Sequence, residues 1–269
     1  ATNTIFGYLA GEDLASGGNY NTFLGHNAGH ENKLGDQNIA IGYQAMDASY
    51  IDDTQDDASI NNLFIGNNSG GGTWVTAASH SNVGVGNNVM TGAMNGANNN
   101  TGVGLNSLVD ITTGYRNTGT GAWSLYEATT GHSNVAVGYA SQQNSTSGLY
   151  NTAVGSDSLY ANVQGDNNTS IGFASLYYFT AGSDGHGSNT AVGSEASRYL
   201  DTGQFNTMIG AKAGESEAGT ITYAENTGVG YKALFALTTG DGNLAIGAYS
   251  GDAITTGGEN TLVGHSSGG

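Results

Sequence analysis

The stretch NTAVGSDSL, residues 151–159, shows the pattern that decides the fold of this chain. An Asn is followed by Thr or an aliphatic residue, a usually small residue, a usually branched apolar residue and Gly. We number coil positions from this Asn, so that Asn151 is position 1 and Gly155 is position 5. A small residue and often Leu follow at positions 8 and 9, here Ser158 and Leu159.

The motif occurs fifteen times in 269 residues. The copies begin at Asn3, Asn21, Asn38, Asn62, Asn82, Asn100, Asn117, Asn134, Asn151, Asn168, Asn189, Asn206, Asn226, Asn243 and Asn260. A Gly stands at position 5 of every copy, as at Gly42, Gly138, Gly155, Gly172 and Gly247. Eight of the fourteen spacings are 17 residues and none is shorter. A short minimal period with occasional insertions is typical of a solenoid in which each repeat forms one coil.

Each repeat is too short for a helix-containing unit and predicts a β coil. Positions 2 to 4 form a short strand that ends in a bend at the motif Gly, where positive φ or a close backbone approach is expected. A second short strand around positions 8 and 9 and a return turn at a second Gly complete the coil, as at Gly148 before Asn151. The sequence therefore predicts an all-β fold, a parallel β-solenoid (β-roll) of about fifteen ~17-residue coils. We expect a single repeat domain over residues 1–269, either complete or a segment of a longer fibre.

Strand alternation divides the motif into two faces. We assign positions 2 and 4, such as Thr152 and Val154, to the interior of the coil. Position 3, such as Ala153, then faces a neighbouring chain. A flat face of Ala and Gly suits close packing and predicts a homo-oligomer, most simply a parallel trimer. Five copies carry a larger residue at position 3: Ile5, Phe23, Phe64, Met208 and Leu262.

The repeated Asn has two interpretations. Stacked Asn side chains form an amide ladder in which each bonds the next coil. Alternatively, each Asn serves its own turn by bonding local backbone and tolerating left-handed geometry. Neither interpretation is catalytic.

Composition excludes several classes of protein. The formal net charge is -17, with five Lys+Arg against 22 Asp+Glu, so the chain lacks a basic patch for nucleic acid. No apolar run approaches the ~20 residues that span a bilayer, which predicts no membrane insertion. The absence of Cys excludes disulfides and thiolate metal sites. The acidic balance favours an extracellular, cell-surface or virion-surface location.

Four insertions of three residues or more interrupt the period and are the expected partner-facing loops, because insertions at a constant place in a repeat often form its variable face. The candidate contact residues are Asp52, Asp53, Asp56, Asp57, Trp74, Tyr177, Tyr178 and Tyr223. The four Asp offer oxygen ligands for Ca²⁺, but the absence of a Ca²⁺-binding spacing favours a solvated acidic loop. No cofactor or metal site is predicted from the scattered His, and no catalytic motif is present, which predicts that the chain is not an enzyme.

The motif resembles a known family. The units at 151–159 and at 38–46, NIAIGYQAM, are similar to the head repeats of trimeric autotransporter adhesins and to repeats of phage tail-fibre proteins. The resemblance covers essentially the whole chain, although the family's period is typically shorter than 17. It implies left-handed β-rolls, three chains side by side, and contact with a host surface or glycan.

We therefore expect a structural protein of an extracellular fibre, surface appendage or phage tail fibre. It adheres through its inter-coil loops and associates with copies of itself, as a trimer or as an end-to-end filament. One alternative is an ice-binding solenoid, because Thr occupies position 2 in ten of fifteen copies, although the inward assignment of that Thr argues against it. Carbohydrate binding through exposed aromatic residues is another. A polysaccharide-cleaving enzyme is the weakest alternative, because paired carboxylates at matching positions are absent.

Overall fold

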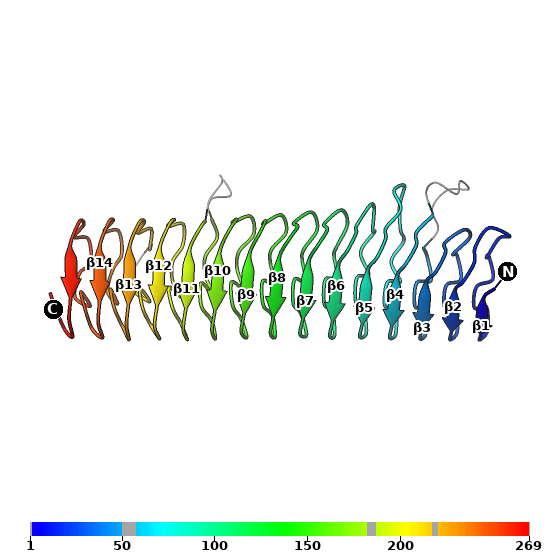
Figure 1. Cartoon of the computed structure of the whole chain (residues 1–269), viewed down its shortest axis with the longest axis horizontal. Helices are drawn as coiled ribbons and strands as arrows, with labels where there is room; N and C mark the ends of the chain where they lie inside the picture. The colour runs from blue at the N-terminus through cyan, green and yellow to red at the C-terminus, as the bar shows by residue number, and fades with distance from the viewer. Residues whose placement is uncertain (1, 50–57, 182–186, 217–219, 269) are drawn as a thin grey trace. The chain divides into compact units, whose positions relative to one another are not determined.

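A computed structural model of the chain describes residues 2–49, 58–181, 187–216 and 220–268. It is an all-β, parallel β-solenoid of about fourteen turns, with one three-residue strand per coil. The fifteen strands follow one another in sequence order in a parallel sheet (Figure 1). No described residue belongs to a helix long and apolar enough to cross a membrane.

The chain divides into two compact units, Ala1–Ser133 and Asn134–Gly269. The first contains β1 (Thr4–Phe6), β2 (Thr22–Leu24), β3 (Ile39–Ile41), β4 (Leu63–Ile65), β5 (Val83–Val85), β6 (Thr101–Val103) and β7 (Thr118–Thr120). The second contains β8 (Val135–Val137), β9 (Thr152–Val154), β10 (Thr169–Ile171), β11 (Thr190–Val192), β12 (Thr207–Ile209), β13 (Thr227–Val229), β14 (Leu244–Ile246) and β15 (Thr261–Val263). Every strand covers positions 2 to 4 of its motif, as the repeat predicted.

The register places equivalent motif positions on top of one another. Within the second unit Thr152 pairs with Thr169, and Thr169 pairs in turn with Thr190. Insertions between motifs do not disturb this pairing, although β10 and β11 are separated by a longer segment. Each motif position therefore forms a column that runs from coil to coil.

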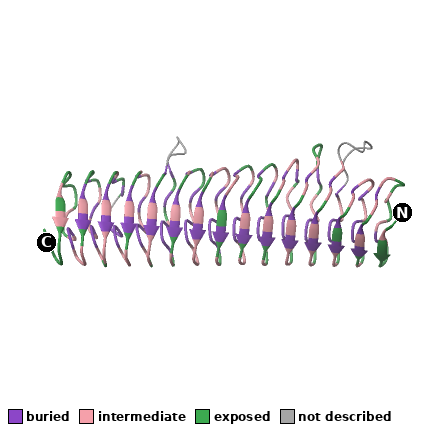
Figure 2. Ribbon diagram, viewed as in Figure 1, coloured by how far each residue is buried: buried purple, intermediate pink, exposed green. Residues whose placement is uncertain are grey.

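The faces of the strand are opposite to the sequence-based assignment. Position 3 is buried: Ala153, Ser170 and Ala191 have no exposed surface. Positions 2 and 4 point outward instead, and Ile171 keeps 38% and Ile209 40% of its surface exposed (Figure 2). The prediction that Thr152 and Val154 face the interior and that Ala153 faces a neighbouring chain is therefore wrong. The interior is too narrow for two columns of branched side chains, because one short strand forms its wall.

Two positions share the filling of this narrow core. Where position 3 is large, position 9 of the same coil is Gly, as in the pairs Phe23 and Gly29, and Phe64 and Gly70. Where position 3 is small, position 9 is usually a long side chain, as in the pair Ala153 and Leu159. A Cβ added at Gly29 would lie 2.7 Å from the ring of Phe23, so both sites cannot be filled at once. The five large position-3 residues therefore belong to this exchange of volume.

The second predicted strand does not form. Residues at positions 7 and 9 have left-handed backbone, with φ of 56° at Asp157 and 54° at Leu159. A strand requires negative φ at both. The part of the coil from position 6 to the next motif, which we call the return arm, is therefore a series of turns. It is still bonded between coils, because the N–H of Leu159 donates to the carbonyl of Ser175 at 2.9 Å. These bonds and the burial of Leu159 offset the cost of about 1–2 kcal/mol for left-handed geometry at a non-Gly residue.

The asparagine ladder is confirmed. The Oδ1 of Asn151 accepts the backbone N–H of Asn168 at 2.9 Å, and the Oδ1 of Asn168 accepts that of Asn189 at 3.1 Å. The Nδ2 of Asn189 crosses its coil to the carbonyl of Gly203 at 2.9 Å. The second Gly of the repeat thus receives the amide of the motif Asn, and both ends of the buried side chain are bonded.

The motif Gly forms a tightly packed backbone column. Gly155 has φ of +134°, and a Cβ added there would lie 2.5 Å from the carbonyl oxygen of Gly172 in the next coil. Gly172 stands in the same relation to Gly193, at 2.4 Å. Both expected reasons for this Gly, positive φ and close approach, therefore apply at the same residue.

Candidate functional site: the outward face of the strands

The outward side chains of positions 2 and 4 form a regular surface in each unit, which we call the strand face. In the second unit it combines an uninterrupted row of Thr with a row of Val and Ile across five consecutive strands. The Thr row consists of Thr152, Thr169, Thr190, Thr207 and Thr227, and the aliphatic row of Val154, Ile171, Val192, Ile209 and Val229. Adjacent strands lie about 4.8 Å apart, so both rows have a constant repeat.

Exposed apolar side chains of the second unit gather around this face. Of thirteen large apolar residues that the described structure leaves exposed there, eleven lie at position 2 or 4 or directly beside the motif. These are Val135, Val137, Tyr139, Tyr150, Ile171, Phe173, Phe205, Ile209, Tyr231, Ile246 and Val263. Contiguous apolar surface of this kind marks an interaction site more often than scattered exposure does.

The strand face carries no charge. None of the fifteen coils has a charged residue at position 2 or 4, although the formal net charge of the chain is -17. In the described part of the second unit, the hydroxyls of its five consecutive Thr make no hydrogen bond to the protein. The face therefore offers solvent a repeated hydroxyl and methyl pattern on a sheet held by main-chain bonds.

Two of the predicted partner-facing residues lie in the core instead. Trp74 is 2% exposed, meets the ring of Phe64 edge-on at 5.9 Å, and donates its Nε1–H to the carbonyl of Gly70 at 3.1 Å. Tyr223 is fully buried, and its hydroxyl lies 2.8 Å from the carbonyl of Gly214. Burial raises the pKa of Tyr223. Trp74 thus packs against the ring of Phe64 and Tyr223 bonds the carbonyl of Gly214, so both insertion residues extend the core.

The other predicted contact residues have different outcomes. Tyr177 and Tyr178 lie on the surface of the return arm, and Tyr178 is 46% exposed. The acidic loop residues Asp52, Asp53, Asp56 and Asp57 lie outside the described residues. Among the residues that are described, no group of three or more His, Asp or Glu is arranged to hold a metal ion.

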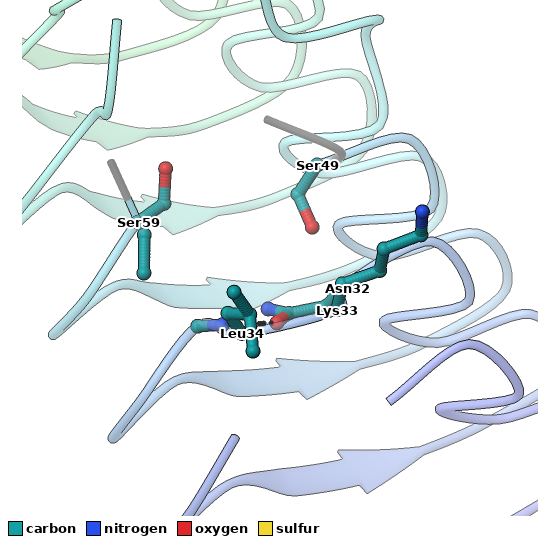
Figure 3. Close-up of a pocket in the computed structure, with 7 residues that line it drawn as sticks. Asn32, Lys33, Leu34, Ser49 and Ser59 are labelled. Atoms are coloured by element: carbon teal, nitrogen blue, oxygen red, sulfur yellow. Dashed lines mark hydrogen bonds between the residues drawn. The ribbon is translucent and has the colours of Figure 1, made fainter. Parts of the chain in front are cut away.

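The described cavities are small or open. One beside the return turn of the third coil has a volume of about 10 Å³ and is lined by Asn32, Lys33, Leu34, Gly35, Ser49, Ala58 and Ser59 (Figure 3). It has room for about one water molecule. The Oδ1 of Asn32 accepts the N–H of Gly35 at 2.9 Å there, as Figure 3 shows. A shallow hollow of about 370 Å³ is formed by core residues of the first coil, including Ile5 and Leu14.

No family model, no curated protein and no solved structure matches this chain. The resemblance to autotransporter head repeats therefore stays an expectation, and functional inference depends on the surfaces of the molecule.

Ion pairs between neighbouring coils were not foreseen from the sequence. His30 lies 3.0 Å from Glu12 and 3.4 Å from Asp47, and Lys212 lies 2.7 Å from Glu195. The partners are 17 or 18 residues apart, which is one coil. Comparing charges at the repeat spacing would have found all three pairs, because such residues stand in one column.

Proposed function

We propose that this chain is a structural β-solenoid of an extracellular fibre, surface appendage or phage tail fibre, and that it self-associates through the strand face. The observation that carries the proposal is the gathering of exposed apolar side chains on an uncharged face of an acidic protein. A second copy meets no like charge there, whereas most other approaches bring acidic surfaces together. Three chains side by side, which the resemblance implies, fit the proposal.

The free energy of association indicates how much of the strand face must be buried between two copies. Full burial of Val or Ile is worth about 1.5–3 kcal/mol, so covering the exposed third or more of one is worth roughly 0.5–1 kcal/mol. Five position-4 residues of the second unit are exposed by this much and contribute about 2.5–5 kcal/mol, against association costs of about 4–15 kcal/mol; they are Val137, Ile171, Ile209, Ile246 and Val263. The aliphatic row alone does not suffice. The flanking aromatics, such as Phe173 and Phe205, belong to the interface that we propose.

The Thr row constrains the interface further. Burying a hydroxyl without a partner costs about 1–3 kcal/mol, so five unpaired Thr would cancel the apolar gain. Thr side chains of one copy must therefore bond Thr or water of the next. In-register side-by-side association meets this condition, because it sets equal rows against each other.

The test is the mass of the purified chain in solution, measured by light scattering. We expect a multiple of 27.2 kDa for the parent chain. The double variant Val192→Glu, Ile209→Glu places two carboxylates on adjacent strands of the face and should be monomeric. The matched control Thr180→Glu adds a carboxylate on the return arm and should keep the parent mass. A monomeric parent chain at 100 µM would contradict self-association.

A second candidate function is ice binding, and one observation favours it. The Thr row points outward and its hydroxyls are unpaired within the described structure, which removes the objection raised by the inward assignment. A rigid array of hydroxyl and methyl groups at constant spacing fits a periodic ligand such as an ice surface. The same face cannot serve both functions, so one preparation distinguishes them. A monomer that inhibits ice recrystallisation, and loses this activity in Thr190→Glu, supports ice binding; an inactive oligomer supports the structural role.

We assign adhesion, the second part of the proposed function, to the return arm of the coil. Trp74 and Tyr223 are buried and are unavailable to a partner. Tyr177 and Tyr178 are at the surface and belong to a larger aromatic cluster. We therefore place adhesion there, on a different part of the coil from the strand face.

A further inference from the structure

Four tyrosines of three consecutive coils form one cluster on the return arm of the second unit. Tyr160 stacks on Tyr177 with ring centroids 4.9 Å apart and planes 3° apart. Tyr178 stacks on Tyr199 at 5.3 Å and 14°. Tyr177 and Tyr178 meet edge to face at 4.6 Å and 70°. We call these four residues the tyrosine ridge. They occupy positions 10 and 11 of their coils, where other coils of the chain mostly carry acidic or small residues.

Arg198 contacts two rings of the tyrosine ridge, and because its charge is paired with a carboxylate the ridge is nearly neutral. Its guanidinium carbon lies 5.8 Å from the ring centre of Tyr177 and 5.3 Å from that of Tyr199. Its Nη1 donates to the Oε1 of Glu195 at 2.6 Å. The Nε of Arg198 is shielded from solvent and has no hydrogen-bond partner in the described structure. The charge of Arg198 is thus balanced, while one of its donors remains unsatisfied.

The ridge has the chemistry of a binding surface for an amphipathic ligand. Tyrosine supplies a large, rigid contact with an apolar ring and a polar hydroxyl at low entropic cost. Burial and the neighbouring tyrosines raise the pKa of Tyr177, so its phenol remains a donor at neutral pH. The balanced Arg198 and the net charge of -17 disfavour nucleic acid and sulfated polymers. A saccharide, with apolar C–H faces and many hydroxyls, matches both halves of the tyrosine side chain.

We propose that the tyrosine ridge binds a neutral, hydroxyl-rich glycan. This inference rests on the adhesive part of the proposed function and names its partner class. Sugar C–H groups pack on the exposed parts of the rings, and sugar hydroxyls bond the phenols. Three consecutive coils supply the rings, so an extended oligosaccharide fits better than a single sugar.

Binding is tested on the full chain with cellohexaose and the hexamer of N-acetylglucosamine as probes, by calorimetry and by NMR. We expect at least one probe to bind, and Tyr178→Ala to weaken it about two- to tenfold, because one aromatic contact is worth about 0.5–1.5 kcal/mol and 1.4 kcal/mol is tenfold. Tyr178→Phe keeps the ring and should lose less. The control Tyr139→Ala removes a tyrosine that is 57% exposed beside the strand face, and it should bind like the parent chain.

The outcomes separate the two proposals. Failure of both probes to bind at millimolar concentration overturns the glycan proposal, and so does equal binding by Tyr178→Ala and Tyr139→Ala. Unchanged melting temperature and circular dichroism show that Tyr178→Ala is folded, and Tyr199→Ala repeats the test if it is not. Ridge variants should keep the parent mass, and the Val192→Glu, Ile209→Glu variant should keep glycan binding. A parent chain that is monomeric but binds a probe therefore refutes only the strand-face proposal.

Discussion

At the scale of single residues, the coil is specified by which side chain occupies its narrow core. Positions 3 and 9 reach the same space from opposite walls, so Phe64 stands with Gly70 while Ala153 stands with Leu159. Met208 and Gly214 repeat the first arrangement in the second unit, where a Cβ on Gly214 would lie 3.0 Å from the sulfur of Met208. Volume is therefore conserved in the pair of positions and not at either one alone.

This exchange predicts strong coupling between Ala153 and Leu159. Ala153→Met alone overpacks the core and should cost about 1–3 kcal/mol of unfolding free energy. Leu159→Gly alone leaves a cavity and should cost about 2–5 kcal/mol. The double variant reproduces the pairing of Met208 with Gly214 and should cost clearly less than the sum, with a coupling energy of about 1–3 kcal/mol. Urea unfolding of the four proteins measures the cycle; additivity within about 0.5 kcal/mol would refute the exchange.

The half-buried ring of His80 accepts a backbone hydrogen bond, which predicts pH-dependent stability. Its Nδ1 accepts the backbone N–H of Ile60 at 3.2 Å, and burial lowers the pKa of His80. The folded state thus binds this proton less readily than the unfolded state. The contribution of the neutral ring is complete above the unfolded pKa of about 6.5 and is lost as the pH falls below it.

The variant His80→Asn isolates this effect. Asn98 stands at the same position one coil on, and its Oδ1 accepts the N–H of His80. An Asn at residue 80 therefore keeps an acceptor for Ile60 but does not titrate. Melting temperatures at pH 8 and pH 5 should fall more for the parent chain than for His80→Asn. An equal fall in melting temperature for the two proteins would show that protonation of the His80 ring does not reduce the stability of the parent chain.

At the scale of the coil, main-chain and side-chain bonds between neighbours replace regular secondary structure. Each strand has only three residues, and the return arm has left-handed turns at two positions. The asparagine ladder, the Gly column and the inter-coil bonds of the return arm run through the same stack. Charged pairs at the repeat spacing add to these bonds. Stability is therefore expected to depend on contacts between coils more than on any one coil.

The pairing of Lys212 with two carboxylates predicts a second pH effect. Its Nζ lies 2.7 Å from Glu195 in one coil and 3.0 Å from Glu215, whose side chain is 1% exposed. Lys212→Met leaves Glu215 buried without its cation. We expect a loss of roughly 2–3 kcal/mol, below the 3–5 kcal/mol of a fully buried pair, because the lysine is one-third exposed.

The hydrogen bond from Lys212 is the main cause that lowers the pKa of Glu195. This contribution is complete above the unfolded pKa of about 4.3 and is lost as the pH falls through the lower folded value. The stability difference between the parent chain and Lys212→Met should therefore shrink between pH 7 and pH 3. Lys232→Met is the control, because Lys232 lies over the ring of Phe235 at 4.4 Å and its loss should be independent of acid pH. If the loss of stability in the two variants depended equally on pH, the effect could not be assigned to the contact of Lys212 with Glu195.

At the scale of the whole molecule, charge and apolar surface are separated. The strand face is uncharged in every coil, while the chain carries a formal charge of -17. Self-association through that face must work against long-range repulsion of the acidic remainder. Repulsion over more than about 10 Å is largely screened at 0.1 M salt, whereas apolar contact is not weakened by it.

Salt should therefore strengthen self-association. Sedimentation equilibrium in 0.01 M and 0.5 M NaCl should give the larger average mass at the higher concentration. An interface built on ion pairs would respond in the opposite direction. Dissociation of the oligomer by 0.5 M NaCl would thus place the contact away from the uncharged strand face.

The order of residues was enough to predict the solenoid, its period, the strand at positions 2 to 4 and the role of Gly155, because each depends on the repeat alone. It left the Asn ladder as one of two interpretations, and the structure decided for the ladder. Alternation also identified two faces, but not which face is inside. The Asn ladder answers that question, because residues two apart on a strand lie on the same face. If Asn151 at position 1 points inward, Ala153 at position 3 must also point inward. Only the tertiary structure decided which residues of the insertions are buried. Trp74 and Tyr223 are buried because Trp74 packs against Phe64 and Tyr223 bonds Gly214 and Ser197, contacts that exist only in the folded solenoid.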